Sequence, residues 1–194
     1  MIFSLAQTKD AEIIARIHKD EISTGFLSSL SNAFLTRFYR AIIQSPSSFC
    51  VIANVDGKIV GFIAGVSNMN AFYSYFLRHY FFQSFFILLP KVFSSFRKIL
   101  ESLWYPKKEQ SLSGAELLTI AITKEFQGKG IASSMLPIFI SEMKKRDIEV
   151  FNVVVGENLA TAIKFYEKNN FVFLKNTLIH GKNISKIYTF TIHS

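Results

Sequence analysis

Two glycines one residue apart, Gly128 and Gly130, follow closely on an apolar run of the sequence. Glycine permits a sharp turn and lets the backbone come close to a ligand. A segment of helical pattern begins directly after the second glycine, and the free N–H groups and positive dipole end of a helix N-terminus favour anions. Lys129 adds a full positive charge between the two glycines. These residues predict a loop that holds a phosphate group.

Three kinds of phosphate-binding loop compete for this segment. A Walker loop requires a glycine, four further residues and then Gly-Lys-Ser/Thr, which the sequence Gly-Lys-Gly-Ile at 128–131 does not supply. A dinucleotide fingerprint requires a third glycine where this chain has Ser133, although Glu157 could accept a hydrogen bond from a ribose. Too little chain follows for a doubly wound sheet, so this alternative is weak. The third alternative is a site for the pyrophosphate of a pantetheine cofactor.

Two blocks of sequence carry a resemblance that favours the third alternative. The pattern Gln127-x-x-Gly130-x-Ala132 resembles the acetyl-CoA-binding motif of the GNAT superfamily of N-acetyltransferases. Downstream, Asn158, Ala162 and the run Phe-Tyr-Glu-Lys-Asn-Asn-Phe at 165–171 resemble the later signature of that family. The order and separation of the blocks fit as well. The resemblance is sharp over about 115–175, looser towards the N-terminus, and absent from 70–110.

This resemblance implies transfer of an acetyl group from acetyl-CoA to a primary amine of a small molecule or protein, without a metal. Tyr166 would hydrogen-bond the sulfur and act as general acid, and Asn158 would contact the pantetheine arm. The remaining residues implied in acetyl-CoA binding lie along the strand at 116–122 or in the loop and first helical turn after it: Ile120, Ala121, Ile122, Gln127, Gly128, Lys129, Gly130, Ile131, Ala132 and Ser133.

The chain departs from the family pattern at two positions. Asn158 stands eight residues before Tyr166, where the family usually has seven, and Leu159 holds the usual place. Asn158 could therefore be only a helix cap, which its residue type favours equally. Asn170 replaces the usual glycine before Phe171, and asparagine tolerates the left-handed conformation that a helix end often needs.

The general base is not fixed by the resemblance. Some relatives carry a glutamate on the strand at 149–155, where this chain has valines. Glu116, at the start of the central strand, is the best candidate, acting directly or through a water molecule. His79 and His180 are further candidates, although a lone histidine is more often structural or solvent-exposed.

Hydrophobic periodicity predicts the elements that position these residues. Asp-Gly at 56–57 between two β-rich runs is a strong hairpin signal, and Pro137 should kink the helix that contains it. The strand–helix–strand order of the second half requires a parallel crossover. The resemblance implies an α/β fold, a mixed and mostly antiparallel sheet with a central parallel pair flanked by helices. We expect strands at 2–5, 49–53, 58–66, 116–122, 149–155, 171–175 and 184–192, and helices at about 10–22, 131–146 and 159–169. A further helix is expected after Gly25, ending before Pro46.

An aromatic helical insertion is expected at about 70–110. The segment 72–89 is apolar nearly all round, and after Pro90 a second segment is amphipathic. The stretches without charge are too short to span a bilayer. Two interpretations remain, a helical insertion that closes over the core and borders the acceptor cleft, or a pair of helices at 72–104 that lies on a membrane or a partner. We favour the insertion.

Composition sets the outer limits of the interpretation. At 194 residues, a single domain covering 1–194 is the default. The single cysteine, Cys50, excludes a disulfide framework, and the absence of a secretory signal favours a cytoplasmic protein. The net charge of +8 suits an anionic partner, such as a nucleotide-linked amino sugar, but no nucleic-acid-binding motif is present. Homodimer formation and a non-catalytic role, as a CoA-binding or partner-binding module, stay open.

Overall fold

The computed structural model describes residues 1–23, 27–88, 114–179 and 183–193. Seven strands form one sheet in the order β1-β2-β3-β4-β5-β7-β6, and only the central β4–β5 pair is parallel. This confirms the expected α/β class. The strands are β1 (Ile2–Leu5), β2 (Ser48–Val55), β3 (Lys58–Val66), β4 (Glu116–Ile122), β5 (Val150–Gly156), β6 (Val172–Ile179) and β7 (Asn183–Thr191). The α-helices are α1 (Ala11–Glu21), α2 (Asn32–Gln44), α3 (Met69–Leu88), α5 (Ile131–Lys144) and α6 (Ala160–Lys168).

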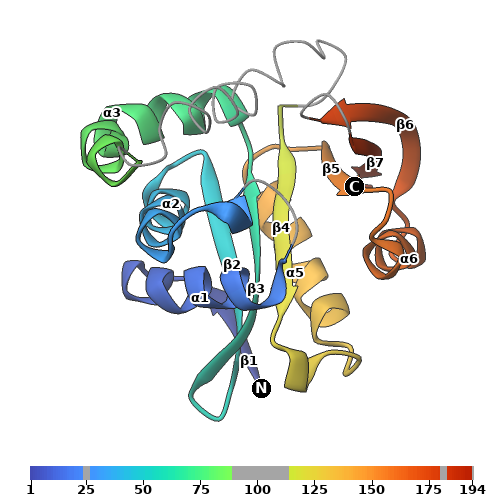
Figure 1. The fold of residues 1–194 in the computed structure, drawn as a ribbon. Coiled ribbons are helices and arrows are strands. Elements are labelled where there is room, and N and C mark those ends of the chain that lie inside the picture. The colour runs from blue at the N-terminus through green and yellow to red at the C-terminus, as the bar shows by residue number, and fades with distance from the viewer. Residues whose placement is uncertain (24–26, 89–113, 180–182, 194) are drawn as a thin grey trace.

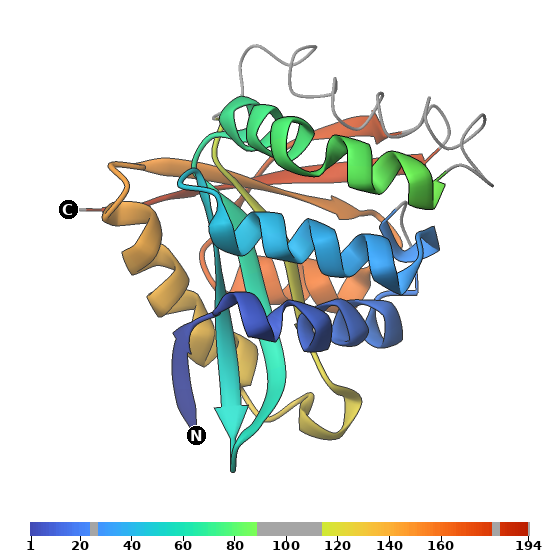
Figure 2. The ribbon, with the colours of Figure 1, turned by 90° about the vertical axis from the view of Figure 1, so that its left-hand side faces the viewer.

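The helices cover the two faces of the sheet in separate layers (Figure 1, Figure 2). α1, α2 and α3 pack on one face around a core that includes Leu35, Tyr39 and Phe62. α5 and α6 pack on the other face around a core that includes Phe139 and Phe151. Because each strand alternates its side chains between the faces, both layers can be filled from the same seven strands.

The predicted hairpin between β2 and β3 is confirmed. Asp56 and Gly57 form its turn with φ of 50° and 82°, the positive values that a two-residue type I′ turn requires. α5 is likewise close to its predicted range and is continuous over Pro137. The predicted ends of β6 were less accurate, since this strand extends to Ile179, four residues beyond the expected end.

The first half of the predicted insertion is the helix α3, which packs on α2. Phe72, Phe76 and Tyr80 are buried in the shared core. The ring of Phe72 lies 5.8 Å from that of Phe38, and the ring of Phe76 lies 6.0 Å from that of Phe34. Within the described residues, no helix is long and apolar enough to cross a membrane. The amphipathic half, after Pro90, falls outside the described residues.

A buried polar chain joins α1, α2 and β4. His18 Nδ1 lies 2.5 Å from the hydroxyl of Tyr39, which also hydrogen-bonds Thr119. Burial, together with the charge of Lys19, lowers the pKa of His18 to about 4, so the ring is neutral at physiological pH. Burial raises the pKa of Tyr39 well above its ordinary value. These hydrogen bonds among His18, Tyr39 and Thr119 hold β4 against α1 and α2.

Candidate active site

The two central strands are joined at one end only. β4 and β5 each have seven residues, yet their register holds just two pairs, Glu116 with Asn152 and Leu117 with Val153. Beyond this joint, β5 continues alongside β7 and β4 continues alongside β3. The carboxyl-terminal half of β4 therefore has a strand partner on one side only, within the described residues.

Strand alternation identifies which backbone groups of β4 face this opening. The N–H of Thr123 donates to the carbonyl of Val60 at 2.8 Å, on the β3 side. Because backbone groups alternate between the two edges of a strand, those of Ala121 also face β3, whereas those of Ile120 and Ile122 face β5. The N–H groups of Ile120 and Ile122 thus have no strand partner within the described part of the chain.

The loop after β4 has the conformation that its glycines predicted. Gly128 and Gly130 have φ of 73° and 77°, and Gly130 is the left-handed cap residue before α5. The first hydrogen bond of α5 runs from the N–H of Ser134 to the carbonyl of the cap residue Gly130, at 3.0 Å. Lys129 is exposed, with Nζ 4.9 Å from the ring centroid of Phe126. The backbone N–H groups of the first turn, those of Ile131, Ala132 and Ser133, have no partner within the helix.

The last residue of α1 holds this loop from the other layer. Glu21 accepts hydrogen bonds from the backbone N–H of Lys124 at 2.9 Å and from the side-chain amide of Gln127 at 3.0 Å. The same amide nitrogen of Gln127 donates to the carbonyl of Ile122 at 2.8 Å. The side chain of Gln127 is therefore engaged in shaping the loop, which fixes the position of the two glycines relative to β4.

Glu116 lies at the closed end of the opening, within electrostatic range of two tyrosines. It is half-buried at the start of β4, and desolvation raises the pKa of its carboxyl group to about 7. Tyr73 on α3 and Tyr166 on α6 are close enough that the charge of Glu116 contributes, after burial, to raising the pKa of each hydroxyl. The two residues predicted to be catalytic, Glu116 and Tyr166, thus lie within electrostatic range of each other.

The ring of Tyr166 is fixed by aromatic neighbours. It is 4% exposed, 5.1 Å from the ring of Phe171 and 6.4 Å from that of Tyr188. Asn170 adopts the predicted left-handed conformation, with φ of 65°. This reversal lets the N–H of Phe171 donate to the carbonyl of Tyr166 at 3.0 Å, which closes the end of α6. Tyr166 is therefore held at the last turn of the helix, pointing into the core side of the opening.

Asn158 does not cap α6. The cap position is Leu159, with no side-chain hydrogen bond, so the helix-cap interpretation of Asn158 was wrong. Asn158 is exposed, and its Oδ1 would lie 2.9 Å from a Cβ added to Gly156. Glycine at the end of β5 therefore leaves room for this amide beside the strand.

The other base candidates are not brought to this place. His79 is exposed on α3, where its ring stacks on that of Tyr75 at 4.2 Å. His180 lies outside the described residues. The structure adds two residues that the sequence did not single out, Tyr73 and the buried Asn152 beside Glu116. No sequence motif marks Asn152, and Tyr73 is one of many aromatic residues in its segment.

Comparison with known proteins decides the family. The family model of the acetyltransferase (GNAT) family matches residues 16–171. The chain belongs to this family. No curated protein sequence matches the chain.

Solved structures of similar fold include GNAT enzymes from several bacteria. The ribosomal-protein-S18-alanine N-acetyltransferase of Escherichia coli is 15% identical, with a TM-score of 0.63 over 100% of this chain and 94% of that chain. The ribosomal-protein-alanine N-acetyltransferase of Brucella melitensis is 12% identical, with a TM-score of 0.65 over 99% of this chain and 100% of that chain. The protein yncA of Salmonella typhimurium, solved with its cofactor acetyl-CoA, is 12% identical, with a TM-score of 0.64 over 100% of this chain and 95% of that chain. At these identities the likeness concerns the fold.

The GNAT family uses acetyl-CoA, and the residues described above fit such a ligand. The unpartnered N–H groups of β4 can bind amide carbonyls of a pantetheine arm, and the amides of the first turn of α5 can bind a pyrophosphate. Among the described residues, no group of three or more histidine, cysteine or acidic side chains is arranged to hold a metal ion.

Proposed function

We propose that this protein transfers the acetyl group of acetyl-CoA to a primary amine by direct attack of the amine on the thioester. The observation that carries the proposal is that Glu116, at the closed end of the β4–β5 opening, lies within electrostatic range of Tyr166. Amine acetylation requires a proton acceptor and a proton donor near the reacting atoms. The acetyl-CoA cosubstrate would supply the activated acyl group.

The binding residues divide into three groups with different tasks. The amides of Gly128 to Ser133 would hold the pyrophosphate, with Lys129 adding a positive charge at the rim. The backbone of Ile120 and Ile122 would bind the pantetheine, while the small side chain of Ala121 packs behind it in the core. Asn158 would contact the pantetheine from the turn after β5. Gln127 would act through the loop that it shapes, with Glu21.

Glu116 is suited to act as the base. A carboxyl group with a pKa of about 7 is partly ionised at neutral pH, and it is a stronger base than an exposed glutamate. It would take the proton that the attacking amine loses. The raised pKa of Tyr166 keeps its hydroxyl protonated, so that it can donate to the departing sulfur. The net result moves one proton from the amine to the thiol of CoA.

The acceptor is a small-molecule amine in this proposal, because the aromatic helix α3 carries Tyr73, which lies within electrostatic range of Glu116. Such an aromatic wall beside the acceptor favours an apolar or sugar-bearing amine over a flexible basic peptide. An amino sugar or a nucleotide-linked amino sugar fits both the wall and the positive net charge. A ribosomal protein N-terminus, the target named for two structural neighbours, is the second class to test.

A panel of amines with acetyl-CoA tests the activity, and two variants test the site. Acetyl-CoA should raise the melting temperature, because a ligand that binds the folded state stabilises it. Tyr166→Phe should lower kcat by about 10²-fold or more, if the hydroxyl is the acid. Tyr188→Phe is the matched control, since it removes a neighbouring tyrosine hydroxyl that bonds Glu167 at 2.8 Å instead.

Three outcomes separate the alternatives. Acetylation that depends on the Tyr166 hydroxyl supports the proposed mechanism. Turnover that is unchanged in Tyr166→Phe refutes the acid role. Thermal stabilisation by acetyl-CoA without turnover of any small amine or N-terminal peptide would support the alternative, a non-catalytic CoA-binding module.

A further inference from the structure

Apart from the β4–β5 opening, a pocket lies near the end of α5 that is opposite the glycine loop. The helix has 14 residues, so its two ends are separated by about 20 Å. The pocket has a volume of about 440 Å³, within the range of small-molecule sites. It is bounded by the end of α2, the exit of β3, the first turns of α3 and the residues after α5. Its lining residues are Ser45, Pro46, Ser47, Ser67, Ala71, Tyr75 and Arg146.

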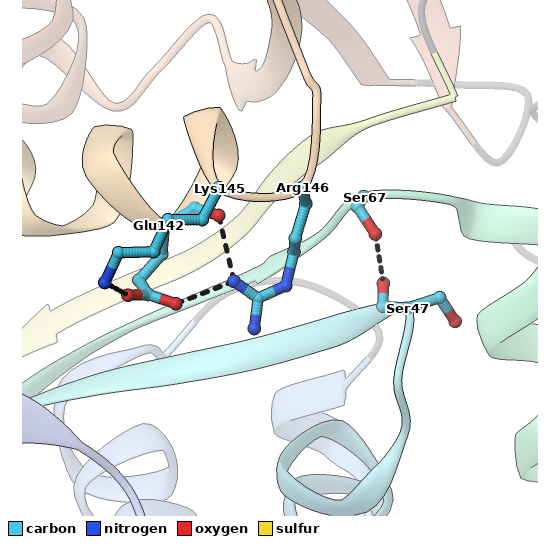
Figure 3. Close-up of polar contacts among 5 residues, drawn as sticks. All are labelled: Ser47, Ser67, Glu142, Lys145 and Arg146. Atoms are coloured by element: carbon cyan, nitrogen blue, oxygen red, sulfur yellow. Dashed lines mark hydrogen bonds and ion pairs between the residues drawn. The ribbon is translucent and has the colours of Figure 1, made fainter.

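Arg146 presents part of its guanidinium group without a protein partner. Nη1 donates to the carbonyl of Glu142 at 2.9 Å and to its carboxylate at 2.7 Å, as Figure 3 shows. The guanidinium carbon lies 4.4 Å from the ring centroid of Phe49, which fixes its plane. The side chain is only 25% exposed. Within the described residues, its Nε and Nη2 donors make no hydrogen bond. This edge is the planar fork that binds carboxylate and phosphate groups with two parallel hydrogen bonds.

The charges around Arg146 do not balance. Glu142 is 8% exposed and accepts from Arg146 and, at 2.6 Å, from Lys145. Burial alone would raise the pKa of Glu142, but the hydrogen bonds from Lys145 and Arg146 hold it below its ordinary value, so the group stays ionised. One carboxylate therefore faces two cations, of which Arg146 lines the pocket and Lys145 is exposed outside it.

The serines give the pocket a fixed polar wall. The N–H of Ser67 donates to the carbonyl of Ser47 at 2.9 Å. The hydroxyl of Ser67 donates to the same carbonyl at 3.2 Å (Figure 3). The hydroxyls of Ser45 and Ser47 lie 3.0 Å apart, and either can donate to the other. One hydroxyl hydrogen of this pair is therefore not used within it and can donate to a ligand. The opposite wall is apolar, formed by Pro46, Ala71 and Tyr75.

From these contacts we infer that the pocket is a second binding site, which takes a small molecule through a phosphate or carboxylate group held by Arg146 and the serine pair. The apolar wall receives the rest of the molecule, against the ring of Tyr75. This site is separate from the acetyl-transfer site, and the inference does not depend on the proposed function.

Inorganic phosphate and benzoate are suitable probes of the two anion types. Each is titrated into the ¹⁵N-labelled full chain, with and without CoA, while the Nε–H signal of Arg146 is followed by NMR. We expect a saturable shift of this signal by at least one probe, and the same shift in the presence of CoA. Binding of phosphate alone assigns a phosphate ester, and binding of benzoate alone assigns a carboxylate.

Three variants complete the test by calorimetry. Arg146→Lys keeps the charge but loses the fork, and it should weaken binding about tenfold or more. Ala71→Phe leaves Arg146 and its ion pair intact and should block the pocket, which guards against a folding defect in the first variant. Lys144→Gln removes an exposed charge outside the pocket and should bind like the natural chain. An unshifted Arg146 signal with both probes, or full affinity in Ala71→Phe, overturns the inference.

Discussion

Replacing Glu116 with glutamine should abolish acetyl transfer and yet make the protein more stable. Glutamine keeps the size of the side chain but cannot take a proton, so kcat should fall by about 10²- to 10⁴-fold if Glu116 is the base. In the natural chain, log kcat should rise with pH up to an inflection near 7, because the carboxylate is the active form and its pKa is about 7. A typical amine acceptor titrates about three units higher, so the two inflections separate.

The stability effect follows from the same pKa. Desolvation disfavours the charged form and raises the pKa of the carboxyl group from its ordinary 4.5 to about 7. The folded state therefore binds more protons than the unfolded state between pH 4.5 and 7, and the contribution of Glu116 to stability falls as the pH rises through that window. The shift corresponds to about 3.4 kcal/mol at most, since one pKa unit is about 1.4 kcal/mol. Partial exposure of the side chain lowers this value towards about 1 kcal/mol.

Urea denaturation of both proteins at pH 4 and pH 8 measures this difference. The stability of Glu116→Gln relative to the natural chain should increase by about 1–3 kcal/mol between these pH values. Glu149→Gln, an exposed carboxylate before β5, is the control and should show no such change. A variant that retains the inflection near pH 7 would place the base elsewhere. A stability difference that is independent of pH would show that Glu116 is not desolvated.

Two further variants test the loop and the buried polar chain. Gly130→Ala should raise the KM for acetyl-CoA and lower stability by about 1–2 kcal/mol, measured by kinetics and urea denaturation; a Cβ there meets nothing within 4 Å, so the cost comes from the left-handed backbone at φ 77°. Tyr39→Phe should cost about 1–3 kcal/mol, because it leaves His18 and Thr119 without their buried partner. The loss of stability below pH 6.5, where the unfolded state takes up a proton that the neutral His18 resists, should persist in Tyr39→Phe, because burial and the charge of Lys19 keep the pKa of His18 low. A variant that lost this acid limb would show that Tyr39 itself keeps the histidine neutral.

Local sequence signals were sufficient for most of the fold. Apolar periodicity placed the strands and helices, and Asp-Gly at 56–57 fixed the hairpin, because these features depend on neighbours a few residues away. The glycine pair predicted its own left-handed geometry for the same reason. The family resemblance then supplied the mixed sheet with a central parallel pair, and the full strand order came only from the structure.

Contacts between distant segments could not be predicted. The approach of Tyr73 on α3 to Glu116 on β4 depends on how a helix crosses the sheet, and one aromatic residue among many carries no sign of it. The tie from Glu21 to the loop after β4 spans about a hundred residues, and only the fold brings its ends together. The role of Arg146 was hidden similarly, since a cation in the last turn of a helix is ordinary.

The joint of two residue pairs between β4 and β5 also determines how the amides of one strand exchange with solvent. Along β4, the N–H of Ala121 is covered by β3, as is that of Thr123 after the strand, whereas those of Ile120 and Ile122 face the side where pairing has ended. In deuterated water, the free protein should therefore show alternating slow and fast exchange on successive residues. A ligand bound in the opening would erase this alternation, and it would do so without any movement of the strand.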